Sequence, residues 1–213
     1  MENKKIICPE CGEMINVHVK EFVDVTEDPV YKEQMLNGTF FLAKCPKCES
    51  ETLMEYPLMY IDSEKKLNIY MAPDLDDDLV EQLNSIQVPY GEEESDAVFR
   101  VTSGCDSLLE KILIAENGRD DRVIELYKLI VAESLKEELP GISSAQFLYY
   151  TEGEDEFFII FGYDNAEEEQ LTVPLDGELY NELMADYIDD LYIPPNQYAE
   201  VNCQWMEDHI DFE

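Results

Sequence analysis

Cys8-Pro9-Glu10-Cys11-Gly12 and Cys45-Pro46-Lys47-Cys48-Glu49 are two nearly identical stretches within the first fifty residues of the chain. Two Cys-x-x-Cys pairs are typical of a site in which four thiolates hold Zn²⁺ in a tetrahedron. The prolines preset the backbone dihedral φ for the tight turn between the cysteines. We therefore expect one structural zinc ion, with Cys8, Cys11, Cys45 and Cys48 as its four ligands.

The two pairs differ in the residue that follows them. Gly12 can adopt the left-handed backbone conformation that commonly closes such a turn. Glu49 stands where glycine is preferred, so we expect the second turn to be more strained or more open. The 33 residues between the pairs exceed the usual spacing of about 15–20, so the zinc ribbon must carry an insertion.

Three other interpretations of the cysteines fit the sequence less well. Disulfides need an oxidising compartment, and residues 1–7 offer no apolar core of a signal peptide. A redox-active pair would open a helix, whereas residues 15–20 alternate between apolar and polar and predict a strand. A catalytic zinc would need an open coordination position, and His18, the nearby candidate, lies on the polar face of that strand.

The composition excludes several classes of protein. The 213 residues carry a formal net charge of −36, which opposes binding to the backbone of DNA or RNA. Hydrophobic residues make up 45% of the chain, enough for a globular core. No apolar run approaches the roughly 18 residues of a membrane span. We expect a cytoplasmic protein that binds neither nucleic acid nor a membrane.

The negative charge is concentrated in the last third of the chain. No Lys or Arg follows Lys136, whereas 21 acidic residues lie between Glu137 and Glu213. These acids form either a heavily solvated surface or a face for a partner with a basic surface. The lysines near the cysteine pairs would offset the charge of four thiolates; they are Lys4, Lys5, Lys44 and Lys47.

The order of expected elements favours an α+β fold, because strands and helices occur in runs rather than in regular alternation. A zinc-ribbon-like β region with a helical insertion is expected over residues 1–90. An acidic α+β region with antiparallel strands and two to four helices is expected to pack against it over residues 91–213, after a linker at 84–97. The expected helices are 30–36, 76–83, 106–116, 120–139, 177–191 and 203–209, and the expected strands are 15–25, 39–43, 52–61, 66–71, 98–102, 145–151, 156–163, 170–173 and 198–202.

The two Cys-Pro-x-Cys turns and three later stretches together resemble the CpXC domain family. The later stretches are residues 56–62 (Tyr-Pro-Leu-Met-Tyr-Ile-Asp), 109–112 (Leu-Glu-Lys-Ile) and 118–125 (Gly-Arg-Asp-Asp-Arg-Val-Ile-Glu). The similarity runs from the first turn to about Leu139. Because that family is functionally uncharacterised, the resemblance implies a domain and a metal site, and it implies no activity.

Other candidate sites are weaker. Asp120 and Asp121 could form a catalytic or metal-binding pair, but their place at the start of a helix favours capping of its backbone N–H groups. Asp74 begins a stretch that copies the first ligand positions of an EF-hand, yet the required glycine and final glutamate are missing. Cys105 and Cys203 are isolated and are expected to be buried small hydrophobic residues.

The sequence thus predicts a zinc-stabilised acidic protein that serves as a protein–protein interaction or adaptor module. One alternative is a hydrolase-type enzyme whose carboxylates come together in the fold. Another is an acidic inhibitor that mimics DNA. A deep pocket with converging acids and strongly shifted pKa values would favour the enzyme, and a flat face with phosphate-like spacing of carboxylates would favour the mimic.

Overall fold

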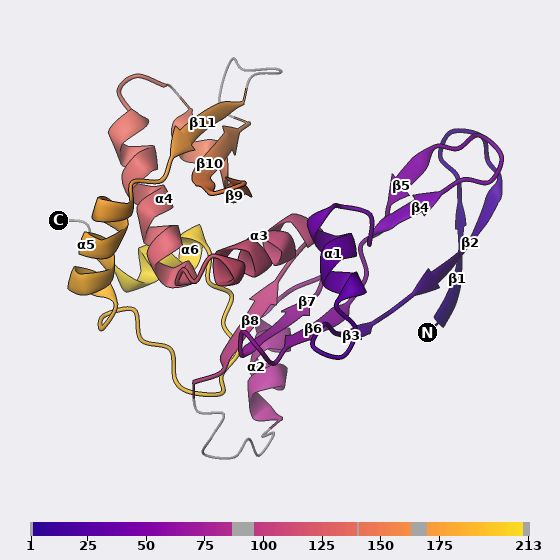
Figure 1. The fold of residues 1–213 in the computed structure, drawn as a ribbon, viewed down its shortest axis with the longest axis horizontal. Coiled ribbons are helices and arrows are strands. Elements are labelled where there is room, and N and C mark those ends of the chain that lie inside the picture. Colours follow the sequence, from indigo (N-terminus) through magenta and orange to yellow (C-terminus); the bar gives the residue numbers. More distant parts are fainter. Residues whose placement is uncertain (1, 87–95, 140, 163–169, 211–213) are drawn as a thin grey trace. The chain divides into compact units, whose positions relative to one another are not determined.

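The computed structural model describes residues 2–86, 96–139, 141–162 and 170–210, and they form an α+β fold (Figure 1). The strands are β1 (Glu2–Ile7), β2 (Met14–Val19), β3 (Phe22–Asp24), β4 (Leu42–Lys44), β5 (Glu51–Leu53), β6 (Leu58–Asp62), β7 (Leu67–Met71), β8 (Val98–Thr102), β9 (Gln146–Glu152), β10 (Asp155–Phe161) and β11 (Leu171–Pro174). The helices are α1 (Val30–Leu36), α2 (Asp77–Ser85), α3 (Cys105–Glu116), α4 (Asp121–Leu135), α5 (Gly177–Tyr187) and α6 (Cys203–His209), with a 3-10 helix η2 at Ile142–Ser144.

The chain divides into two compact units, and neither is a continuous stretch of sequence. The first unit comprises Met1–Leu109 together with Pro195–Ala199, and the second comprises Glu110–Pro194 together with Glu200–Glu213. The expected division into regions 1–90 and 91–213 stays a prediction. Most of the expected linker, residues 87–95, lies outside the described residues.

Two β-hairpins carry the cysteine pairs in the first unit. Strands β1 and β2 pair antiparallel around the first cysteine pair, and β4 and β5 do so around the second. Alternate residues of β2 are buried, so the predicted amphipathic strand is confirmed over Met14–Val19. The insertion between the pairs contains β3 and the helix α1, whose expected bounds, 30–36, are also confirmed.

A four-stranded sheet in the order β3-β6-β7-β8 forms the rest of the first unit. Its central strands bury Leu58, Tyr60, Ile69 and Met71 completely. The sheet is mixed, because β7 pairs with β6 antiparallel and with β8 in parallel. Since parallel neighbours need a crossover, α2 provides it between β7 and β8. The sequence pattern did not indicate this βαβ connection.

Four expected strands differ from the structure. Of the expected strand 39–43, only Leu42 and Ala43 belong to β4. The stretch 15–25 is two strands, β2 and β3, and the stretch 52–61 is likewise divided into β5 and β6. Residues 198–202 do not form a strand, and in the described chain Ala199 makes a single parallel bridge with Arg100. This bridge and the bonds of Asn84 to the backbone of Tyr198 hold the returning segment on the first unit.

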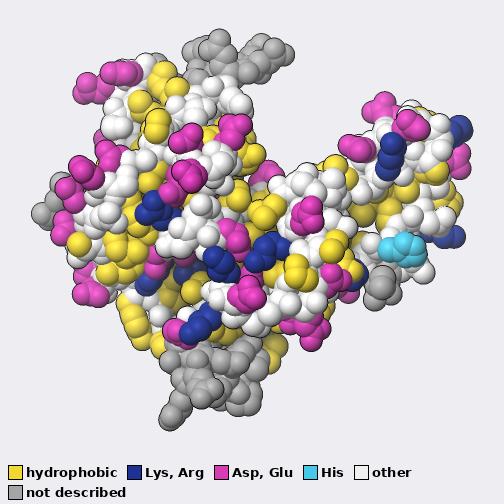
Figure 2. Space-filling view, in the orientation of Figure 1, with side chains coloured by type: hydrophobic (Ala, Val, Ile, Leu, Met, Phe, Trp, Pro, Cys, Tyr) yellow, Lys and Arg dark blue, Asp and Glu magenta, His cyan; other side chains and the backbone are white. Residues whose placement is uncertain are grey.

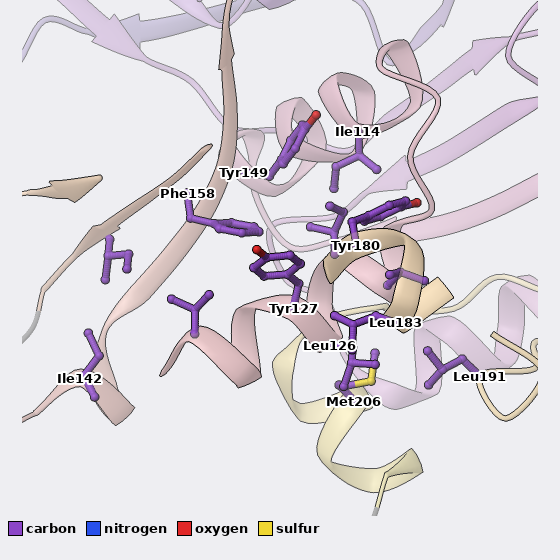
Figure 3. Packing of buried hydrophobic residues seen from close by; sticks show 14 residues of the cluster. Ile114, Leu126, Tyr127, Ile142, Tyr149, Phe158, Tyr180, Leu183, Leu191 and Met206 are labelled. Carbon is purple, nitrogen blue, oxygen red and sulfur yellow. The ribbon is translucent and has the colours of Figure 1, made fainter. Parts of the chain in front are cut away.

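The second unit packs the sheet β11-β10-β9 together with α4, α5 and α6 around one hydrophobic core (Figure 3). The ring of Phe158 on β10 lies 5.2 Å from that of Tyr127 on α4 and 6.3 Å from that of Tyr149 on β9, measured between centroids. Met206 anchors α6 in the same core. The expected helix 203–209 is confirmed, whereas helix 120–139 ends at Leu135 and helix 177–191 ends at Tyr187.

Within the described part of the chain, no helix combines the length and the apolar character that crossing a membrane requires.

Candidate metal centre

The two cysteine turns have the same backbone hydrogen bonds. In the first turn, the N–H of Cys8 donates to the carbonyl of Glu13 at 2.8 Å, and the N–H of Gly12 donates to the carbonyl of Cys8 at 3.0 Å. In the second turn, Cys45 donates to Ser50 at 2.8 Å and Glu49 donates to Cys45 at 3.0 Å. This matching geometry presents both sulfur atoms of each turn toward one centre.

Glu49 adopts the left-handed backbone conformation that Gly12 adopts at the equivalent position of the first turn. Its φ is 61°, compared with 71° for Gly12. A side chain in this region disfavours the conformation, because Cβ approaches the following carbonyl oxygen. The expectation of strain in the second turn is therefore confirmed, and the expectation of a more open turn is wrong, because its hydrogen bonds match those of the first.

The four sulfur atoms lie within 4.8 Å of one another. The Sγ atoms of Cys8 and Cys48 are 3.6 Å apart, and so are those of Cys11 and Cys45. A tetrahedral ion with metal–sulfur bonds of about 2.3 Å would space its ligands by about 3.8 Å. All four thiols are free rather than paired in disulfides, so the cluster can hold one metal ion.

The hairpins share only a small hydrophobic core beside this cluster. Its buried members outside the cysteines are Ile15, Val17 and Ala43, and Ile6 and Met54 pack against them partly buried. A core of this size supplies little of the free energy that folding requires. Metal binding at the cysteine cluster would therefore add stability that this core does not supply.

Ser50 provides a hydroxyl to two of the cysteines. Its Oγ lies 3.2 Å from Sγ of Cys8 and 3.1 Å from Sγ of Cys48. Among the protein groups alone, the pKa of Cys8 is lowered to about 6, chiefly by the hydrogen bond with Ser50 and also by backbone hydrogen bonds with Cys11 and Glu10, which together outweigh burial. The pKa of Cys11 is raised to about 12 by burial and the three other thiols, although its strongest single interaction, with the backbone of Glu13, lowers it. The cluster thus favours the thiolate form at Cys8 and the thiol form at Cys11.

Two of the four lysines expected to offset the thiolates have carboxylate partners. Lys47 lies 3.4 Å from Glu13, and Lys4 lies 3.1 Å from Glu21. His18 is exposed on the outward face of β2, as its position in the alternating strand predicts.

Asp120 is the N-cap of α4, as the sequence predicts. Its side chain accepts a hydrogen bond from the backbone N–H of Arg122 at 3.0 Å and two more from the guanidinium group of that arginine. Asp121 lies in the first turn of α4, where its charge suits the helix dipole as expected, and it also has a second role. It is buried at the first helical position and forms an ion pair with Lys111 at 3.1 Å.

A buried cluster of five charged side chains on α3 and α4 was not found by sequence reasoning. Lys128 lies 2.7 Å from Glu110 and 3.0 Å from Glu125, and Lys111 lies 3.2 Å from Glu125. With Asp121, all five are less than 10% exposed. Burial raises the pKa of Glu110, and it is opposed by the charge of Lys128. These carboxylates face lysines, so the cluster is built as a set of internal ion pairs.

The remaining candidates take structural positions. Cys105 is buried at the start of α3, where burial raises its thiol pKa to about 12 and makes it a poor nucleophile. Cys203 is exposed, so the expectation that it is buried is wrong. Asp76 is the N-cap of α2 and accepts from the N–H of Leu79 at 2.8 Å, in place of a calcium loop.

Comparison with known families gives one finding. A family model described as CpXC protein matches residues 6–128, which is more than half of the chain and includes all four clustered cysteines. Neither curated proteins nor solved structures give a match.

Proposed function

The chain belongs to the CpXC family, and from this premise we propose that it is a zinc-stabilised module that binds a protein with a basic surface. Zinc holds the ribbon, and the acidic region after Lys136 provides the recognition surface. The observation that carries the second part is the line of acidic side chains along α5.

The donor set of the cluster supports zinc. Four thiolates are soft ligands, and closed sites of four cysteines are the usual structural sites of Zn²⁺. Cys8 and Cys45 are at most 1% exposed, whereas Cys48 is exposed, so the cluster is covered on one side only. Zinc binding would supply folding free energy to a ribbon whose own core is small.

Helix α5 presents acids along one side. Glu178, Glu182 and Asp186 follow one another at intervals of four residues, so they lie on the same face, and Asp189 and Asp190 come directly after the helix. All five are exposed. Like charges at this spacing destabilise a helix by a few tenths of a kcal/mol per pair. A helix that keeps them gives up stability, which supports a role in recognition.

The cations of the second unit do not neutralise this surface. Each of them is paired with a carboxylate of its own unit; the pairs are Lys111 with Asp121 and Glu125, Arg119 with Glu156, Arg122 with Asp120, Lys128 with Glu110 and Glu125, and Lys136 with Glu133. Acidic side chains are spread over the surface in Figure 2. A partner with Lys or Arg would displace their counterions and gain affinity at low salt.

The enzyme alternative does not gain comparable support. The carboxylates that converge in the second unit, Glu110, Asp121 and Glu125, are buried against two lysines rather than presented to a substrate. A DNA mimic would use the same acidic surface, and its partner would be a DNA-binding protein.

Charge reversal tests the proposed function. One variant carries Glu178→Lys, Asp186→Lys, Asp189→Lys and Asp190→Lys; Glu167, Glu168 and Glu169, three further acids of the region, lie outside the described residues. The matched control reverses four exposed acids of the first unit, Glu10, Glu33, Glu64 and Glu81. Affinity capture at low and moderate salt should lose the partners in the first variant and keep them in the control. Unchanged capture and salt dependence would make the acidic surface a solubility device.

A further inference from the structure

Strand β10 is apolar on both faces. Residues 157–161 read Phe-Phe-Ile-Ile-Phe, in the middle strand of an antiparallel sheet. Antiparallel sheets commonly bury one face and expose a polar one, which gives alternating sequences. A continuous apolar run is typical of a strand that is covered on both sides.

Two of the five residues in this run lie on the inner face of the sheet, which packs against the core of the second unit. Phe158 and Ile160 are fully buried, and Tyr149 on β9 lies opposite Phe158. These side chains point into the core of the second unit, where Figure 3 shows Phe158 beside Tyr127.

The other three residues of the run lie on a second apolar surface, which we call the outer sheet face. The register places Tyr150 and Pro174 on either side of Phe157, and Leu148 beside Ile159. The apolar members of this face are Leu148, Tyr150, Phe157, Ile159, Phe161 and Pro174, and the polar residues Gln146 and Thr172 lie at its margins beside Phe161 and Ile159. Tyr150 is 45% exposed, and its ring centroid lies 5.5 Å from that of Phe157. Among the described residues, none of the six belongs to the hydrophobic cluster that covers the inner face.

The charges beside the outer sheet face have one sign. Glu152, Glu154 and Asp155 are exposed at the turn between β9 and β10, at one end of the face. No Lys or Arg occurs anywhere after Lys136. A second copy of the chain would bring the same acids against these, and like charges across an interface oppose association. An occupant with cations beside an apolar surface is complementary to both features.

We propose that the outer sheet face binds an amphipathic helix of a partner protein, with its apolar side on the sheet and Lys or Arg beside the β9–β10 turn. Three strands spaced by about 4.8 Å match the width of a helix about 10–12 Å across. Strands of seven residues run for about 23 Å, the length of about 15 helical residues. The inference rests on the proposed function, because it specifies the basic partner as an amphipathic helix and the outer sheet face as the surface that this helix contacts.

The test uses the intact protein and a synthetic 18-residue peptide of Leu and Lys, with Leu at positions i, i+3, i+4 and i+7. The control peptide has the same composition in scrambled order, so it carries the charge without the apolar stripe. Fluorescence anisotropy should show that the patterned peptide binds at least 10-fold more tightly than the scrambled one. Circular dichroism should show that it becomes helical on binding.

Substitutions locate the site. Tyr150→Ser and Ile159→Thr should each weaken binding of the patterned peptide at least 10-fold, and thermal unfolding checks that the variants fold. Tyr192→Ser is the matched control, because Tyr192 is 64% exposed and lies outside the sheet. Glu152→Lys with Asp155→Lys should reduce the dependence of binding on salt.

The outcomes separate this inference from the proposed function. No preference for the patterned peptide, or equal binding by Tyr150→Ser, would overturn the inference. If charge reversal on α5 still abolished capture of partners, the proposed function would stand without it. A dimer in sedimentation velocity that Tyr150→Ser dissociates would overturn the inference in favour of self-association.

Discussion

Glu49 and Gly12 occupy the same position in the two cysteine turns, and both have left-handed backbone, with φ of 61° and 71°. The hydrogen bonds around them are the same. The second turn therefore pays a conformational cost that the first avoids, and the cysteine cluster holds it in place.

Glu49→Gly should tighten metal binding. A non-glycine residue in the left-handed conformation destabilises the folded turn by about 1–2 kcal/mol, and glycine removes this cost. Glycine also makes the unfolded chain more flexible, which offsets about 0.4–1 kcal/mol of the gain. We expect a net gain of between about 0 and 1.6 kcal/mol, measured by competition with a chelator. Gly12→Ala is the opposite change at the equivalent site and should weaken binding. Equal affinities for all three proteins would show that the cluster does not sense this dihedral.

Protein purified without added metal should contain about one Zn²⁺ per chain. Cys45→Ser should lose the metal and unfold the ribbon, because metal binding and folding of such sites are coupled. Metal analysis and the NMR signals of β1, β2, β4 and β5 measure the two effects. Cys203→Ser is the control and should keep both, since Cys203 lies on α6. A metal-free chain with an ordered ribbon and reactive thiols would contradict the assignment.

Asp120→Ala should destabilise the second unit by at least about 1 kcal/mol, because it removes the N-cap of α4. Asp120→Asn keeps a capping oxygen and loses the charge that faces Arg122, so its loss should be smaller. Chemical denaturation gives both values. An Ala variant as stable as the wild type would rule out the capping role.

Lys128→Met should cost about 3–5 kcal/mol, because it leaves the carboxylates of Glu110 and Glu125 buried without their shared cation. Lys136→Met provides a matched control, because Lys136 is the C-cap of the same helix, α4. Its ion pair with Glu133 is exposed, so the free energy of unfolding should change by no more than about 0.5 kcal/mol. If the two variants lost similar amounts of unfolding free energy, burial of the charged cluster would not increase the contribution of Lys128 to stability.

Glu156 should contribute stability that acid removes. The guanidinium of Arg119, which donates to both carboxylate oxygens at 2.9 and 2.6 Å, lowers the pKa of Glu156. Its contribution is therefore complete above the unfolded pKa of about 4.3 and is lost as pH falls through the lower folded pKa.

Glu156→Gln should cost about 1–3 kcal/mol at pH 7, and its difference from the wild type should shrink below about pH 4. Unfolding curves between pH 3 and 7 test this. Glu154→Gln removes a neighbouring exposed carboxylate and should have little effect. A difference that stays constant with pH would exclude the ion pair as its cause.

The cysteine cluster could be predicted from the sequence because its geometry is local. Each Cys-Pro-x-Cys turn places two sulfur atoms by its own hydrogen bonds, so only the meeting of the two turns required the fold. Helices such as α1 and α6 were predicted with their bounds for the same reason, since their periodicity and capping signals are contained in a few residues.

Features made by distant residues escaped prediction. Strand β1 has lysines at its centre and exists because it pairs with β2. The charged residues of α3 and α4 resemble surface positions, and their burial depends on how the two helices pack. Residues 198–202 have the composition of a strand, but among the described residues this stretch makes one isolated β-bridge, between Ala199 and Arg100, and no strand. In each case the structure of the segment depends on contacts with residues outside the short stretch of sequence whose pattern was interpreted.

The return of Pro195–Ala199 to the first unit affects how the protein is made on the ribosome. Asn84 and Arg100 emerge early, whereas their partners Tyr198 and Ala199 are translated about a hundred residues later. At about 5–20 residues per second, the nascent first unit would wait on the order of 5–20 s for its last segment. The segment Pro195–Ala199 would then dock beside β8 only after residues 110–194 of the second unit have been synthesised.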